Sequence, residues 1–219
     1  LVNMLARKAD ALLRTRAART ADATDVKANR TRAGELLDEA EALIQKLLAI
    51  GPTAERYSLL GSALKRRLPL IDDGALDAAL QKVAEAYQNA EALVGAGPQR
   101  LYYPALNVLH VTLLRELLGT LTDADRKAAR DRIAAVRDEV TGAGFKPVCL
   151  WDRIAPVDLD LIEIGVIAVE VRPGHAHVAL VPVLRRFVHA VEHVGVAPEG
   201  ELLLRPEVLQ QARAVGGLA

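Results

Sequence analysis

Three residues near the end of the chain have the types and the spacing of a zinc site. His189, Glu192 and His193 form the pattern H-x-x-E-H. On a helix, two histidines four positions apart lie on one face and can bind one Zn²⁺, while the glutamate activates the metal-bound water. This is the chemistry of a zinc-dependent hydrolase.

A second interpretation of the same segment involves no metal. The apolar positions form a helical stripe, which leaves the histidines on the opposite, solvated side; they are Leu184, Phe187, Val188, Val191 and Val194. A peptidase of this type also needs an acidic ligand far downstream, and few residues follow His193. We therefore expect no enzyme activity, no catalytic residue and no cofactor, and we keep the zinc hydrolase as an alternative.

The other polar motifs are weaker candidates for chemistry. Cys149 has no close basic neighbour, and a free cysteine is usually a buried filler. Asp72-Asp73 and the pair Asp158 and Asp160 suit helix caps or solvated turns better than acid–base catalysis. Gly95-Ala-Gly97 follows a predicted helix rather than a strand, so a phosphate-binding loop is not expected.

Composition narrows the class of protein. The 28 basic and 28 acidic residues give a net charge of zero, which argues against nucleic acid as the main ligand. A single cysteine cannot form an internal disulfide, and the most apolar stretch, near 162–171, is too short and too charged to span a bilayer. We expect a cytoplasmic protein with no membrane partner. Because the chain begins at Leu1 rather than Met, we also expect a piece of a larger protein.

Apolar periodicity predicts mainly helices. A 3.6-residue period and Gly/Pro breaks define the predicted ranges, which are about 4–19, 31–49, 54–67, 76–94, 104–118 and 122–141. Short connections between these helices favour three antiparallel helix pairs over residues 1–146. Residues 147–219 are expected to form a helical capping region, and the alternating valines also predict a small β-hairpin near 164–183. The predicted fold class is all-α.

Two of the predicted helices share a pattern. Tyr57-Ser-Leu-Leu-Gly61 aligns with Tyr103-Pro-Ala-Leu-Asn107, 46 positions later, as an aromatic, an aliphatic three residues on, and then a small or polar residue. The preceding helix has the form Ala40-x-x-x-Ile44-x-x-Leu47, closed by Pro52. These patterns resemble the two helices of a tetratricopeptide repeat. The resemblance implies an α-solenoid in which stacked helix pairs share one core.

The longer unit resembles a more specific module. Segments 57–66, 84–90 and 102–107 are similar to the tetratricopeptide-containing TRAF-binding region of apoptosis signal-regulating kinases and bacterial multidomain effector proteins. This resemblance implies a bacterial regulatory scaffold that binds a protein, a peptide or adjacent domains of its parent chain. A structural spacer that forms a homo-oligomer is a third hypothesis.

In tetratricopeptide stacks the first helix of each pair lines the concave groove. The resemblance therefore implies a partner-binding groove in two units, which consist of Glu55, Ser58, Ser62, Lys65 and Arg66, and of Leu101, Val108, Thr112 and Arg115. Basic residues beside an apolar floor suit a peptide with apolar and acidic side chains. Alternatively, these positions are solvated, or are covered by the segment after Phe145. The neighbouring run Lys65-Arg66-Arg67 is also placed to stabilise a helix C-terminus.

Overall fold

The computed structural model describes residues 1–14, 23–94 and 102–142, and isolated stretches within 155–163, 195–196 and 202–203. The longer elements are α-helices, namely α1 Val2–Arg14, α2 Ala23–Ile50, α3 Ala54–Arg67, α4 Leu76–Val94, α5 Tyr102–Leu117 and α6 Asp123–Thr141. Two 3-10 turns, η2 Leu68–Leu70 and η3 Asp73–Ala75, join α3 to α4. Short strands β1 Gly195–Val196 and β2 Leu202–Leu203 pair antiparallel.

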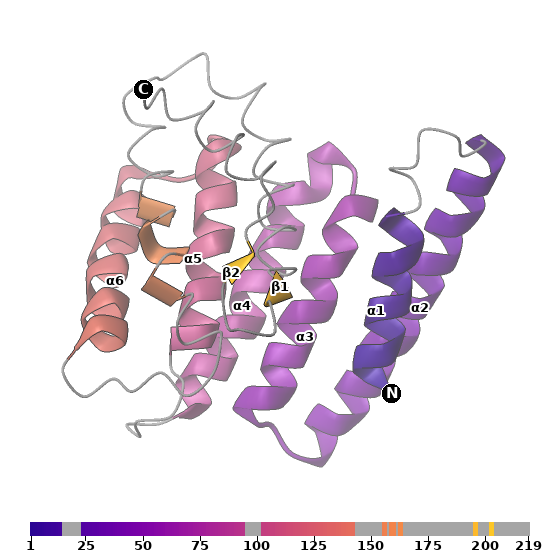
Figure 1. Cartoon of the computed structure of the whole chain (residues 1–219), viewed down its shortest axis with the longest axis horizontal. Helices are drawn as coiled ribbons and strands as arrows, with labels where there is room; N and C mark the ends of the chain where they lie inside the picture. Colours follow the sequence, from indigo (N-terminus) through magenta and orange to yellow (C-terminus); the bar gives the residue numbers. More distant parts are fainter. Residues whose placement is uncertain are drawn as a thin grey trace.

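The helices stack as antiparallel pairs in chain order, from α1 and α2 at one end to α6 at the other (Figure 1). This is a tetratricopeptide-like α-solenoid, so the predicted fold class is confirmed. The β1–β2 pair lies at 195–203, whereas the hairpin predicted near 164–183 falls outside the described residues.

The buried side chains form clusters that run along the stack. Leu5 and Ala9 of α1 pack on Leu36 and Leu37 of α2. Further clusters join α4 to α5, and α5 to α6 and to the residues within 155–163. The cluster between α4 and α5 crosses from one helix pair to the next, as stacking of repeats requires.

Side chains cap the end of α2 and the start of α3, where the two helices meet. Thr53 is the N-cap of α3, and its hydroxyl accepts a hydrogen bond from the Arg56 backbone N–H at 3.2 Å. The Arg56 guanidinium donates to the carbonyls of Leu47, at 2.8 Å, and Gly51. Because the last carbonyls of a helix lack partners inside it, this arginine satisfies the C-terminus of α2.

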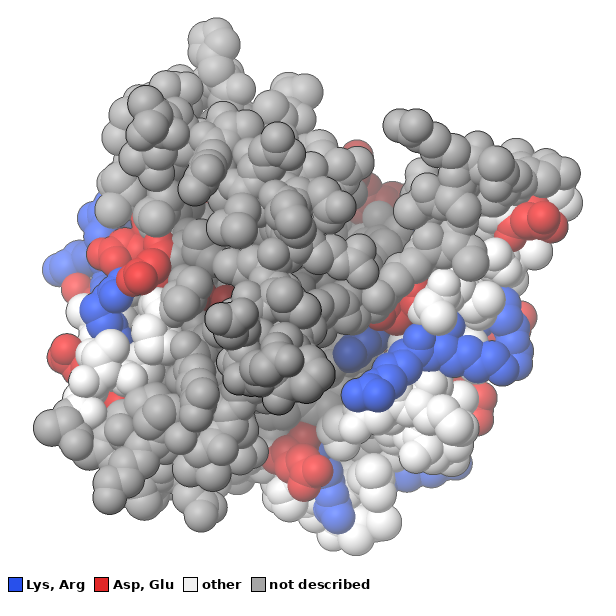
Figure 2. All heavy atoms as spheres, viewed as in Figure 1, with Lys and Arg blue, Asp and Glu red and all other residues white. Residues whose placement is uncertain are grey.

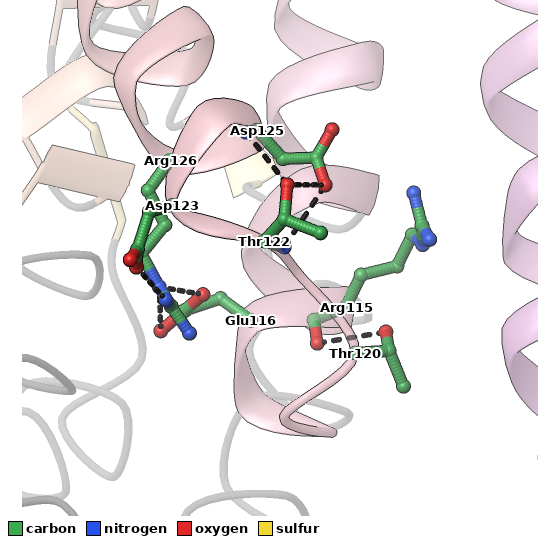
Figure 3. Close-up of polar contacts among 7 residues, drawn as sticks. All are labelled: Arg115, Glu116, Thr120, Thr122, Asp123, Asp125 and Arg126. Atoms are coloured by element: carbon green, nitrogen blue, oxygen red, sulfur yellow. Dashed lines mark hydrogen bonds and ion pairs between the residues drawn. The ribbon is translucent and has the colours of Figure 1, made fainter.

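The α5–α6 connection is held by a polar cluster (Figure 3). Thr122 and Asp125 form a capping box at the start of α6. The Arg126 guanidinium contacts the carboxylates of Glu116, at 2.8 Å, and Asp123, at 2.7 Å. Since the Glu116 side chain is only 4% exposed, Arg126 supplies the charge that a buried carboxylate requires.

Candidate functional site

One side of α3 carries the first unit of the predicted groove. We call Glu55, Ser58, Ser62, Lys65 and Arg66 the α3 face, because their spacing of three to four residues places them along one side of the helix. Glu55 is exposed, and the other members are partly buried. This face therefore carries two hydroxyls and two cations on partly buried residues.

Lys65 connects this face to α5. Its Nζ donates a hydrogen bond to Oδ1 of Asn107 at 2.9 Å, and Nδ2 of Asn107 donates to the Tyr103 carbonyl at 2.9 Å. Asn107 is 5% exposed. The amide thus orients the lysine ammonium, which explains why a polar residue stands at a repeat position where a small one is usual.

Arg66 is held against its own helix. Its guanidinium donates to the Ser62 carbonyl, at 3.2 Å, and to the Ser62 hydroxyl. Its buried Nε has no hydrogen-bond partner among the residues that the structure describes. Arg67, the third residue of the basic run, pairs with Asp38 and Glu41 of α2, both at 2.7 Å.

The second predicted unit does not form one face with the first. Val108 is 5% exposed and belongs to an apolar cluster with α4, so it lies in the core and does not line an open groove. Arg115 points to α4, where its Nε lies 2.8 Å from an Asp77 carboxylate oxygen. Thr112 is partly buried and donates to the Val108 carbonyl at 2.9 Å, and Leu101 falls outside the described residues.

The Arg115–Asp77 contact has a structural role. Hydrogen bonds from Arg115 and then from the Thr120 hydroxyl lower the pKa of Asp77 below its usual range. Thr120 Oγ1 lies 2.6 Å from the same carboxylate oxygen. This group ties the end of α5 to the start of α4.

Asp158 is a buried acid whose burial the sequence did not predict. It is 7% exposed, so it is not the cap or solvated turn expected from the sequence. Burial raises its pKa to about 7, and the positive charge of Lys65 opposes that rise. Its signal in the sequence is its position between Ala155, Leu159 and Ile162, which are buried in the cluster with α5 and α6.

Asp158 and Asp160 differ in environment although they are two residues apart. Asp160 is exposed and pairs with Arg137 of α6 at 2.7 Å, and Glu163 pairs with the same arginine at 2.6 Å. These outward contacts fix the segment to α6. The described residues within 155–163 thus pack against α5 and α6.

The candidate zinc residues lie elsewhere. His189, Glu192 and His193 fall outside the described residues, as does Cys149. In the part of the chain that the structure describes, no group of three or more His, Cys, Asp or Glu side chains could hold a metal ion.

Charge on the visible surface is mixed. In Figure 2, described basic and acidic side chains lie close to one another at both ends of the stack. Among the described helices, none combines the length and the apolar character that a membrane crossing requires. The α3 face, with the contact of Lys65 and Asn107 at its end, is the candidate site.

Comparison with known proteins gives one family. No curated protein and no solved structure matches the chain. A family model, described as Tetratricopeptide Repeats-Sensor, matches residues 2–114, which comprise α1 to most of α5 and include Lys65 and Asn107 but not Asp158. Since this match spans 113 of the 219 residues, the chain belongs to the Tetratricopeptide Repeats-Sensor family.

Proposed function

We propose that this protein is a regulatory scaffold whose α3 face binds an acidic segment of a protein partner or of an adjacent domain of its parent chain. Tetratricopeptide-type repeats generally mediate protein interactions and are generally not enzymes. The resemblance to the TRAF-binding region of bacterial effectors and signalling kinases supports a place in a larger, cytoplasmic multidomain protein, and the family description as a sensor fits a regulatory module.

The observation that carries this proposal is the environment of Lys65. A partly buried ammonium, oriented by the Asn107 amide, lies on the same side of α3 as the hydroxyls of Ser58 and Ser62. Partial burial strengthens the attraction for a carboxylate compared with a fully solvated lysine. A peptide that carries carboxylates therefore suits the cations of this face.

The test measures binding of a defined peptide to a variant in which the charge of Lys65 is removed rather than reversed. The probe is a 15-residue helical peptide of Leu, Ala and Glu, with a Gln-for-Glu analogue as the neutral probe. Met is chosen for the variants because Glu at 65 would add a second carboxylate beside Asp158. We expect Lys65→Met to weaken binding of the acidic peptide about fivefold, which corresponds to about 1 kcal/mol for one charge contact.

Two exposed lysines provide matched controls. Lys82 of α4 and Lys127 of α6 are exposed, and their replacement by Met removes the same net charge away from the α3 face. These variants should bind the acidic peptide as the wild-type protein does. Equal affinity of wild type and Lys65→Met across a range of salt concentrations would remove the α3 face from consideration, because a contacting cation makes binding salt-dependent.

A further inference from the structure

An exposed aromatic ring lies one helical turn from the residue that contacts Lys65. Tyr103 of α5 is 41% exposed, whereas most large apolar side chains of the described helices are covered. It precedes Asn107 by four positions, so the two side chains share one side of α5, about 6 Å apart along the helix axis. Asn107 accepts the hydrogen bond of Lys65. The exposed ring therefore lies near the cation that carries the proposed function.

The ring of Tyr103 is held in place by the core. Helix α4 lies between α3 and α5 (Figure 1), and its Tyr87 is 0% exposed. The Tyr87 ring packs against Gly61 of α3 and meets the Tyr103 ring edge-on, at an interplanar angle of 78°. An edge-to-face contact of this kind favours one orientation of the ring. Gly61 also precedes Lys65 by four residues, so the aromatic contact and the Lys65–Asn107 hydrogen bond follow one another along α3 and α5.

An aromatic side chain that is both exposed and ordered is suited to contact a partner. Tyrosine has only two χ angles, and a ring already oriented by a neighbour loses little further freedom on binding. Aromatic residues are accordingly enriched among the few that dominate binding free energies. The positive charge of Lys65 disfavours a basic side chain over this ring. The position therefore suits an apolar side chain of a partner that also carries a carboxylate.

We propose that Tyr103 is the apolar anchor of the binding site, and that the partner is an amphipathic helix with a large aliphatic side chain one turn from its carboxylate. The carboxylate lies at Lys65, and the aliphatic side chain packs on the Tyr103 ring. This inference rests on the proposed function, since it names the partner of the same site. Residues four apart on a partner helix are separated by about 6 Å along its axis, which matches the separation of Tyr103 and Asn107 on α5.

The experiment is a double-mutant cycle between Tyr103 and the peptide. The leucine peptide is a 15-residue Ala-based helix with the central motif Leu-x-x-x-Glu-x-x-x-Leu, which offers a leucine one turn before and one turn after the glutamate. The alanine peptide has alanine in place of both leucines. We expect wild type to bind the leucine peptide about tenfold more tightly than the alanine peptide, and Tyr103→Ala to abolish this preference.

Two further variants keep the cycle interpretable. Tyr103→Phe keeps the ring and its contact with Tyr87, and should retain the preference of wild type for the leucine peptide. Leu93 of α4 is a matched control, because it is also large, apolar and 46% exposed. Leu93→Ala should bind both peptides as wild type does. The comparison of the two peptides on wild type needs no variant, so it tests the inference even if Tyr103→Ala is destabilised.

The outcomes separate this inference from the proposed function. If Lys65→Met weakens both peptides but wild type shows no preference for the leucine peptide, the anchor role is wrong and the α3 face still binds acidic peptides. If Tyr103→Ala keeps the preference for the leucine peptide, the leucine packs elsewhere and the inference is also wrong. If Lys65→Met changes the affinity for neither peptide, both proposals fail.

Discussion

Replacing Gly61 by leucine should destabilise the protein by about 3 kcal/mol, because the α3–α4 interface has no room for a side chain there. A Cβ at Gly61 would lie 2.7 Å from a ring carbon of Tyr87. Tyr87 is 0% exposed, and its ring meets that of Tyr103 edge-on at a centroid distance of 6.2 Å. The ring therefore cannot move aside without loss of core packing.

A second glycine gives the matched control. Gly34 lies inside α2, where a Cβ would meet only Leu70 at 3.9 Å. Gly34→Ala should raise the free energy of unfolding by up to about 1 kcal/mol through helix propensity, whereas Gly61→Ala should lower it. Urea denaturation of both variants checks this contrast. An unchanged or higher midpoint for Gly61→Ala and Gly61→Leu would contradict the close approach of α3 and α4.

Between pH 5 and pH 8, Asp158 should cost the protein about 2–3 kcal/mol of stability. Burial raises its folded-state pKa to about 7, whereas the unfolded chain keeps the ordinary value of about 4. Between these values the folded state binds the extra proton. Its stabilising contribution is therefore complete below about pH 4, falls as pH rises toward 7, and levels off above that.

The measurement compares urea unfolding of wild type and Asp158→Asn at pH 5, 6, 7 and 8. The difference between the two proteins cancels the other titrating groups, and wild type should lose stability relative to the variant as pH rises. Asp160→Asn, which removes an exposed carboxylate, serves as the control and should follow the wild-type slope in this range. Parallel profiles for wild type and Asp158→Asn would show that Asp158 is not a desolvated acid.

The helices could be predicted from the sequence because the apolar stripe of each helix, and the Gly and Pro residues that end it, are close together in the chain. The ranges 54–67 and 76–94 agree with α3 and α4. The predicted helix 31–49 is shorter than α2, Ala23–Ile50, since the first turns of α2 are polar and lack an apolar period. Gly61, the small residue of the aligned repeat pattern, lies where a Cβ would meet the ring of Tyr87.

The candidate site could be predicted only in part. The positions of α3 follow from a clear amphipathic period, but α5 is buried on most of its circumference. A helix without a polar side gives no signal for which residues face α4, so neither the burial of Val108 nor the pairing of Arg115 with Asp77 could be predicted. The contact of Lys65 with Asn107 spans 42 positions. Such contacts depend on helix stacking, which local periodicity does not encode.

The most direct test of the proposed binding face is to map the acidic peptide on the protein by amide chemical shifts in NMR spectra. We predict that the largest shift changes fall on α3 at Ser58, Ser62 and Lys65 and on α5 at Asn107. The exposed sides of α4 and α6, which carry Lys82 and Lys127, should remain unchanged. Saturable changes confined to α4 or α6, with the amides of α3 unaffected, would contradict the account.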